Sequence, residues 1–185
     1  MGSTVERLTS AQDHGAEPAG RVAILLATKN GASHLEEQLS SYLAQTLENW
    51  CLHVSDDGSS DDTIDIIKRF AATQGRVQTI YEGPRPGHAQ NFLSLAQNSS
   101  IAADYFAFSD QDDIWYPDKL QRALSSLSRI SPTTPALYCS RTEIIANGHS
   151  NEVAVWNSWR KKWLEEKLEG FPVYYVRIVR RPFAS

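Results

Sequence analysis

The chain has 185 residues, of which 41% are hydrophobic and 22% are charged, and its formal net charge is -4 at pH 7. These proportions are ordinary for a folded domain and exclude a wholly disordered chain. The negative balance argues against a general nucleic-acid-binding protein. No apolar stretch approaches the roughly 20 residues that a membrane-spanning helix needs. The composition therefore predicts one globular domain with a hydrophobic core.

Both ends of the chain differ from its middle. Residues 1–20 are polar, rich in small residues and without the apolar core of a signal peptide, so we expect a disordered leader there. Residues 156–185 hold seven Lys and Arg against three acidic residues, whereas the first 155 residues carry a net charge of -8. A basic end of this kind is usually a solvated face, but it also suits a peripheral contact with the anionic inner face of a cell membrane.

The two cysteines predict a reducing environment. Cys51 and Cys139 each lie in an apolar run, where a buried free thiol is expected. Neither belongs to a C-x-x-C pair, and no disulfide framework is implied. The sequence therefore favours a cytoplasmic protein.

Strand-like and helix-like segments alternate between residues 22 and 140. The continuous apolar run at residues 22–27 predicts a strand that is covered on both faces. Ser33 and Glu36 form a capping-box pair, which predicts the start of a helix. Further strands are predicted at residues 51–55, 77–81, 105–108 and 136–140, and Pro117 suits the first position of the fourth helix. The predicted apolar helix faces consist of Leu35, Leu39, Tyr42 and Leu43; Ile64, Ile67, Phe70 and Ala71; Phe92, Leu95 and Ala96; and Leu120, Leu124 and Leu127.

This alternation determines the predicted fold class. Alternating strands and helices predict an α/β protein with three layers, in which a mostly parallel central sheet with right-handed crossovers has helices on both faces.

The alternation of strands and helices is no longer recognisable after residue 141. Residues 142–156, with Asn147-Gly148 at their centre, predict a hairpin. Residues 156–168 predict a helix, and residues 172–183 stay ambiguous.

Two acidic clusters follow strands of this sheet. Asp56 and Asp57 end the second strand, and Asp110, Asp112 and Asp113 end the fourth. In such sheets ligands gather beyond the carboxyl ends of the strands. Carboxylates crowded there repel one another by about 1 kcal/mol per close pair in water, and a bound cation offsets that cost. With phosphate oxygens and water they would form the octahedral oxygen site that suits Mg²⁺ or Mn²⁺.

Simpler interpretations exist for the same acidic residues. A turn with Gly58, or a cap on the next helix, would also explain Asp56 and Asp57. Asp118 suits the first turn of the helix that follows it.

Aromatic and histidine residues near these clusters are ambiguous too. Trp115 and Tyr116 suit either the core or a platform for a sugar ring. His34, His53 and His149 show no ligand spacing, and we treat them as ordinary. His88 differs, because it follows a glycine-rich loop on the ligand side of the predicted sheet.

Five motifs in chain order resemble glycosyltransferase family 2 over residues 22–140. They are Leu26-Ala27-Thr28-Lys29-Asn30-Gly31; the helix residues Gln38, Leu39, Ser41, Leu43, Gln45 and Thr46; Val54-Ser55-Asp56-Asp57-Gly58-Ser59-Ser60-Asp61; Gly87-His88-Ala89-Gln90-Asn91-Phe92; and Phe108-Ser109-Asp110-Gln111-Asp112-Asp113-Ile114-Trp115-Tyr116-Pro117-Asp118-Lys119-Leu120. The form S-D-Q-D-D-I-W is most similar to bacterial rhamnosyltransferase-like members that build surface polysaccharides.

The resemblance implies the GT-A fold of nucleotide-diphospho-sugar transferases. A nucleotide-sugar-binding domain would occupy residues 21–141, and residues 142–185 would form a partial or divergent acceptor-side segment. Thr28 and Asp57 would contact the nucleobase or its ribose, with Asp57 accepting a hydrogen bond from a pyrimidine N–H. Asn30 would belong to the same nucleotide-sugar-binding set, and Asp110 would approach the ribose.

The resemblance also implies a phosphate side of this site. His88 and Asn91 would line the diphosphate, and Asp112 would bind the Mn²⁺ or Mg²⁺ ion that bridges it. The ion would neutralise the charge that grows on the departing nucleoside diphosphate.

The implied function is metal-dependent, inverting transfer of a sugar from a UDP- or dTDP-linked donor to a polysaccharide or lipid-linked glycan acceptor. The sequence shows no counterpart of the family's catalytic base, so the catalytic residues stay unknown, and a nucleotide-sugar-binding fragment without turnover is the alternative. A receiver-type signalling domain also pairs Asp residues with magnesium, but it needs a lysine late in the sheet, and none lies between Lys119 and Lys161. A nucleotidyltransferase would favour a glycine-rich phosphate loop near the first strand, which is absent.

Overall fold

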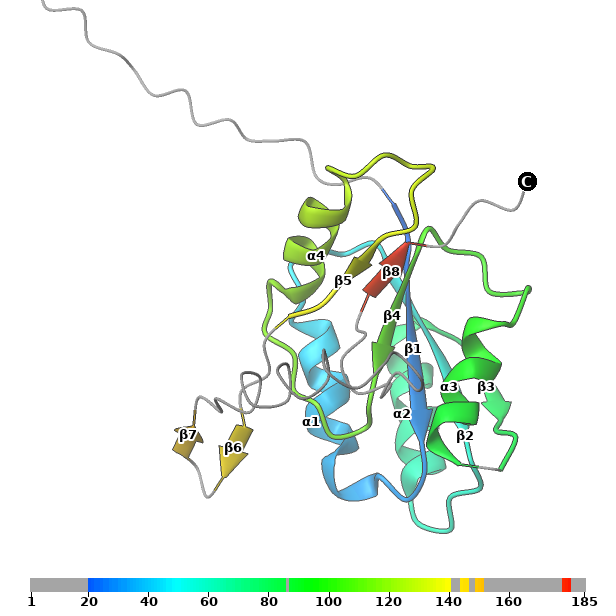
Figure 1. Cartoon of the computed structure of the whole chain (residues 1–185). Coiled ribbons are helices and arrows are strands. Elements are labelled where there is room, and N and C mark those ends of the chain that lie inside the picture. Colours follow the sequence, from blue (N-terminus) through cyan, green and yellow to red (C-terminus); the bar gives the residue numbers. More distant parts are fainter. Residues whose placement is uncertain (1–19, 86, 141–143, 147–148, 152–177, 181–185) are drawn as a thin grey trace, which may run out of the picture.

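The computed structural model describes residues 20–85, 87–140, 144–146, 149–151 and 178–180 (Figure 1). Its elements in chain order are β1 (Val22–Thr28), α1 (Ala32–Leu43), β2 (Trp50–Asp56), α2 (Thr63–Gln74), β3 (Val77–Glu82), α3 (His88–Ala96), β4 (Tyr105–Ser109), α4 (Lys119–Leu127), β5 (Leu137–Tyr138), β6 (Ile144–Ala146), β7 (His149–Asn151) and β8 (Ile178–Arg180). The predicted alternation of strands and helices is confirmed from β1 to α4.

The central sheet has the strand order β3-β2-β1-β4-β8-β5. Strands β3, β2, β1 and β4 are parallel, as predicted. Beyond β4 the pattern differs from the expectation, because β8 from the far end of the chain pairs antiparallel with β4 and separates it from β5. The fifth predicted strand is also short, since β5 holds only Leu137 and Tyr138.

Helices cover both faces of the sheet, so the predicted three-layer arrangement is confirmed. Alternate residues of β1 supply the two cores, as the pleat of a strand requires. Val22, Ile24 and Leu26 pack in a cluster with apolar residues of α1, α2 and α4. Ala23 and Leu25 pack in a second cluster that includes residues of α3. Strand β1 is fully buried and lies at the centre of the molecule.

The predicted apolar helix faces are largely correct. Leu35, Leu39, Tyr42, Ile67, Phe92, Leu95, Leu120, Leu124 and Leu127 are buried, and Ile64 and Phe70 are partly buried against the core. Leu43 is an exception, because its side chain is 43% exposed. Pro117 lies one residue before Asp118, the residue that caps α4, rather than inside the helix.

The predicted capping box of α1 is wrong. The helix begins at Ala32, its capping residue is Gly31, and no local side chain caps it. Its first amides are satisfied by a distant loop instead. The backbone N–H of Gly31 donates to Thr63 Oγ1 at 2.8 Å, and that of Ala32 donates to Asp61 Oδ2 at 3.1 Å. The hydrogen bond from Thr63 lowers the pKa of Asp61, which stays a charged acceptor.

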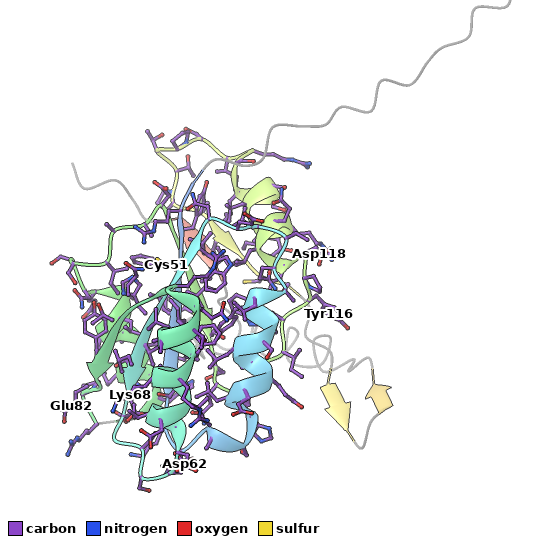
Figure 2. All side chains as sticks on the ribbon, turned by 180° about the vertical axis from the view of Figure 1, so that it is seen from behind. Cys51, Asp62, Lys68, Glu82, Tyr116 and Asp118 are labelled. Atoms are coloured by element: carbon purple, nitrogen blue, oxygen red, sulfur yellow. The ribbon has the colours of Figure 1, made fainter. Side chains whose placement is uncertain are left out.

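The cysteine and aromatic predictions have mixed outcomes. Cys51 is a buried free thiol as expected, and burial raises its pKa. Cys139 is exposed, contrary to the expectation, and it follows the two-residue strand β5. Trp115 is 3% exposed and belongs to the core, where it meets the ring of Tyr42 edge to face at 4.9 Å. Tyr116 is 63% exposed and lies at the outer side of the molecule (Figure 2).

The predicted hairpin is confirmed in residues 144–151, where β6 and β7 pair antiparallel with Ala146 opposite His149. The leader predicted at residues 1–20 falls almost wholly outside the described residues, as do the helix predicted at residues 156–168 and most of the ambiguous segment 172–183. Within the described part of the chain, no helix is long and apolar enough to cross a bilayer.

His53 on β2 gives the first testable prediction. It is buried and stacks on the ring of Tyr81, and burial followed by the charge of Arg21 lowers its pKa below the ordinary 6.5. The unfolded chain therefore binds a proton near pH 6.5 while the folded chain does not, so stability falls as the pH drops below about 6.5. We expect His53→Gln to reduce the loss of melting temperature between pH 7.5 and pH 5.5.

His34 provides the matched control, because it is exposed on α1. His34→Gln should leave the pH dependence of the melting temperature unchanged. Equal pH dependence in the wild type and in His53→Gln would contradict the assignment of this effect to His53.

Candidate functional site

The acidic clusters lie together at the carboxyl edge of the sheet, as predicted. Strands β1, β2 and β4 are parallel neighbours, and the register pairs Thr28 with Asp56 and Leu26 with Ser109. In Figure 2, Glu82 at the end of β3 and Asp62 in the loop before α2 lie at one end of the sheet. Cys51, near the start of β2, lies towards the opposite end. This edge carries every residue that the sequence assigned to the site.

Asp56 organises the loop that follows β2. Its side chain accepts hydrogen bonds from Thr28 Oγ1 at 2.9 Å and from the backbone N–H groups of Gly58 at 3.1 Å and Ser59 at 2.8 Å. The Ser59 hydroxyl donates to the same carboxylate at 2.5 Å. The turn interpretation is therefore correct for Asp56. Thr28 is buried with its hydroxyl hydrogen directed at Asp56, so the structure places it beneath the site.

Asp57 lies beside it, buried and closely approached by Gly83. One carboxylate oxygen accepts from the backbone N–H of Arg85 at 2.5 Å, and Asp57 is 3% exposed. A Cβ on Gly83 would lie 2.9 Å from Asp57 Oδ1 and 2.8 Å from Asn91 Oδ1, closer than real Cβ atoms come. Arg85 itself has a φ of 68°, a left-handed conformation that is uncommon outside glycine. The loop after β3 thus wraps closely around Asp57.

Asn91 joins α3 to the ends of the two central strands. Its Nδ2 group donates to the carbonyl oxygens of Ser55 at 3.0 Å and Thr28 at 3.4 Å. Its Oδ1 atom is buried and has no hydrogen-bond partner among the described residues. The structure therefore brings Asn91 into the predicted cluster, but as a buried residue that fixes α3 below the edge.

His88 and Asp110 meet across the site. His88 is the first residue of α3, and its Nε2 atom lies 3.2 Å from Asp110 Oδ1 at the end of β4. Their side chains are 40% and 25% exposed, so both reach solvent. Asp112 is exposed two residues further on. The prediction that His88 lies on the same side of the sheet as the acidic motif is confirmed.

Asn30 lies in the loop that connects β1 with α1 and bonds to the loop after β2. Its φ of 51° is left-handed, which asparagine tolerates better than most residues. Its backbone N–H donates to Ser59 Oγ at 2.8 Å, and its side-chain oxygen accepts from the backbone N–H of Ser60 at 2.8 Å. The structure thus uses Asn30 to join two loops of the site.

Three further residues hold Asp110 in place, and sequence reasoning did not assign them to the site. The Ser109 hydroxyl donates to the carbonyl oxygen of Asp110 at 3.0 Å and accepts from Tyr42 Oη at 2.7 Å and Gln38 Nε2 at 3.0 Å. All of these side chains are buried. Burial raises the pKa of Tyr42 far above its ordinary value, so its hydroxyl stays a neutral donor. The polar positions Gln38 and Tyr42 on the buried face of α1 were the available signal.

The donor atoms at this edge suit a hard divalent cation. Asp110 and Asp112 offer carboxylate oxygens, the ligands that Mg²⁺ and Mn²⁺ prefer. Among the residues that the structure describes, no three His, Cys, Asp or Glu side chains gather closely enough to hold an ion by themselves. A cation here would therefore share its coordination with oxygens of a ligand, as Mg²⁺ commonly does with phosphates.

Comparison with known proteins identifies the family to which the chain belongs. The model of Glycosyl transferase family 2 matches residues 23–176. The dTDP-rhamnosyl transferase RfbG of Shigella flexneri is 36% identical over 105 residues, which cover 55% of this chain and 36% of that protein. The putative teichuronic acid biosynthesis glycosyltransferase TuaG of Bacillus subtilis is 29% identical over 106 residues, which cover 56% of this chain and 40% of that protein. The chain spans less than half the length of these relatives.

Solved structures share the fold. The mannosyltransferase PcManGT of Pyrobaculum calidifontis, in complex with GDP-Man and Mn²⁺, aligns with a TM-score of 0.59 and 25% identity over 73% of this chain and 40% of that one. TarS 1-349 of S. aureus aligns with a TM-score of 0.51 and 19% identity over 59% of this chain and 32% of that one, which supports the fold alone. The GT-A fold expected from the sequence is confirmed. Because the family model matches most of the length of this chain, the chain belongs to glycosyltransferase family 2.

Proposed function

We propose that this chain binds a UDP- or dTDP-linked sugar together with Mn²⁺ or Mg²⁺, for inverting transfer of the sugar to a polysaccharide or lipid-linked glycan. The observation that carries the proposal is the convergence of Asp57, His88, Asp110 and Asp112 at the carboxyl edge of a family 2 domain. The similarity to a dTDP-rhamnosyl transferase favours a deoxythymidine or uridine nucleotide, whose bases share one ring N–H.

The nucleoside would lie on the side of Asp57. One oxygen of its carboxylate already accepts the backbone N–H of Arg85, and the other oxygen would accept the ring N–H of a pyrimidine. Thr28 and Asn30 act indirectly, because their hydrogen bonds shape the loop that presents Asp57. In this proposal, Asp110 would be the carboxylate that approaches a ribose hydroxyl.

The diphosphate would lie between His88 and Asp112. Asp112, with Asp110 beside it, would hold the cation, which supplies positive charge for the departing diphosphate. His88 is kept in place by Asp110 and by the ring of Phe92, 4.9 Å away edge to face. An imidazole N–H at this position offers a hydrogen bond to a phosphate oxygen. Asn91 fixes the start of α3, and therefore His88, against the ends of β1 and β2.

The acceptor side remains a separate part of the proposal. Inversion needs a base that takes the proton of the incoming hydroxyl. The carboxylates available after residue 140 are Glu143, Glu152, Glu165, Glu166 and Glu169, and all of them lie outside the described residues.

The proposed cytoplasmic location is supported by the two cysteines, which form no disulfide. The proposed contact with the inner membrane face depends on residues 156–185, of which only residues 178–180 are described.

Titration calorimetry with UDP and dTDP tests the donor part of the proposal. We expect clear binding in Mn²⁺ and at least tenfold weaker binding in EDTA, because the diphosphate otherwise faces two uncompensated carboxylates. GDP serves as the control nucleotide, since a purine does not offer the same ring edge. Equal affinity in Mn²⁺ and EDTA would contradict the metal assignment, and tighter binding of GDP would contradict the pyrimidine assignment.

A transfer assay separates this function from the alternative, a nucleotide-sugar-binding fragment without turnover. The alternative is favoured by the fact that all assigned residues belong to the donor side, between Thr28 and Asp112. Nucleotide sugars and lipid-linked acceptors are mixed with the protein and Mn²⁺, and released nucleoside diphosphate is measured. Release that depends on the acceptor supports the transferase. Binding with only slow donor hydrolysis supports the fragment, since loss of a general base typically costs about 10²–10⁴-fold in rate.

A further inference from the structure

We infer that Gln111 is a positioning residue that ties the nucleoside side of the site to the metal side. The inference rests on the proposed function. Gln111 is the residue between Asp110 and Asp112, and its side chain turns away from them towards the loop after β1. Its Oε1 atom accepts from the backbone N–H of Lys29 at 2.8 Å, and its Nε2 atom donates to the backbone carbonyl of Lys29 at 3.0 Å.

This double contact fixes orientation as well as position. A side-chain amide that uses both its donor and its acceptor on one residue has little freedom to rotate, as in the ladder between two strands. Because Gln111 is held in this way, the backbone on both sides of it is held too. The directions of the flanking Asp110 and Asp112 carboxylates are therefore coupled to the Lys29 peptide groups.

The Lys29 loop is in turn tied to the Asp57 side. Lys29 Nζ donates to the backbone carbonyl of Asp57 at 3.0 Å. Asn30 exchanges hydrogen bonds with the Ser59 and Ser60 segment at 2.8 Å. The loop after β1 thus touches both carboxylate-bearing loops, and Gln111 is its contact with the metal side.

Gly31 supplies independent support for this tie. Its backbone has φ of -101° and ψ of 7°, a conformation open to any residue, so backbone freedom does not demand a glycine here. Space does. A Cβ at this position would clash with Gln111 Oε1 and would lie 2.5 Å from Gln111 Cδ. An alanine at residue 31 would therefore push the Gln111 amide away from Lys29.

The consequence concerns a ligand that binds both sides at once. A nucleoside diphosphate with its cation uses the Asp57 side and the Asp112 side together, and it gains affinity only when the two are held at the right separation. Without the Gln111 contact, the Asp57 side would still bind the nucleoside, and the Asp112 side would still bind the cation and the phosphates. A ligand without the second phosphate, such as UMP in EDTA, would lose little.

A double-mutant cycle with Gln111→Ala and Gly31→Ala tests the inference. Affinities are measured by calorimetry for UDP in Mn²⁺ and for UMP in EDTA. We expect each single variant to weaken UDP binding in Mn²⁺ about tenfold, the size expected for losing two hydrogen bonds. UMP affinity should change less than about twofold. The double variant should be no weaker than either single variant, because the severe conflict with the Gln111 amide disappears and only the 3.1 Å contact with the Cβ atom of residue 111 is left.

The controls separate a failure of this inference from a failure of the proposed function. Gln74→Ala removes an exposed glutamine at the end of α2 and should change neither affinity. If the wild type shows no effect of Mn²⁺, the metal part of the proposed function fails and this inference fails with it. If the wild type shows the effect and Gln111→Ala keeps it, only the inference is overturned. Additive losses in the double variant would also overturn it.

Discussion

Replacing Asp112 with asparagine is expected to remove most of the effect of Mn²⁺ on UDP or dTDP binding. The change keeps the size of the side chain but removes the negative charge that attracts the cation. Asp112 is exposed and is not one of the buried residues of the core, so the fold should survive. Loss of residues that merely support a metal ligand costs about 10–100-fold in affinity, and loss of the proposed ligand itself should cost at least roughly 100-fold.

The measurement is calorimetric titration of the nucleotide into each protein in Mn²⁺ and in EDTA, with the melting temperature recorded alongside. Asp118→Asn is the matched control. Asp118 lies six residues later at the start of α4, and its ion pair with Arg122 at 3.6 Å is exposed, so it contributes little stability. An Asp112→Asn protein that retained the full effect of Mn²⁺ would show that other oxygens hold the cation.

Replacing Asp56 with alanine should have the largest effect on stability. The buried carboxylate accepts hydrogen bonds from Thr28, Gly58 and Ser59, the last through both backbone and hydroxyl. Its removal leaves the buried Thr28 hydroxyl without its acceptor and releases the loop that carries Asp57. Hydrogen bonds to a charged group contribute about 1.5–3 kcal/mol each but are not additive, so we expect a loss of about 3 kcal/mol in the free energy of unfolding.

For a domain of this size, that loss lowers the melting temperature by about 6–12 °C. Denaturant unfolding and thermal unfolding of the wild type, Asp56→Ala and Asp62→Asn measure it. Asp62 is the control, because it is exposed at the start of α2 and its side chain makes no capping hydrogen bond. Its replacement should change the free energy of unfolding by less than about 0.5 kcal/mol. A loss below about 1 kcal/mol for Asp56→Ala would mean that the backbone alone holds the loop.

The sequence predicted the elements whose signal is local. Residues 22–27 are apolar without interruption, which is typical of a strand covered on both faces, and β1 is fully buried. The apolar spacing of Leu120, Leu124 and Leu127 likewise predicts the buried face of α4 correctly. The acidic clusters were placed at one edge because alternating strands and helices predict parallel strands, whose carboxyl ends lie at the same edge of the sheet.

The failed predictions share a cause, which is contact between residues far apart in the chain. Ser33 and Glu36 match a capping box, but Asp61 and Thr63 satisfy the start of α1 from a loop about 30 residues later. Cys139 lies in an apolar run that should be a buried strand, yet only two residues pair because β8 takes the place next to β4. Nothing in the local pattern at residues 178–180 specifies that partner.

The same principle applies within the site. The sequence does not reveal that the hydroxyl of Thr28, a residue expected to touch the nucleotide, is directed at Asp56. In the sequence, Gln111 is only the residue between two aspartates of an acidic motif, although it contacts Lys29, which lies 82 residues earlier. Composition and spacing identify which residue types gather at an edge. They do not show which of these residues face the ligand and which hold the others.

The place of β8 has a consequence for synthesis. Three residues, 178–180, cover the outer edge of β4 from a position about 70 residues downstream. While the ribosome is still adding those residues, strands β1 to β4 can already assemble, and the backbone groups of Tyr105, Phe106 and Ala107 stay open to other chains. An uncovered edge next to an apolar strand invites pairing between nascent molecules. Shorter fragments that stop before residue 178 should therefore aggregate during expression, even though they retain all residues of the proposed donor site.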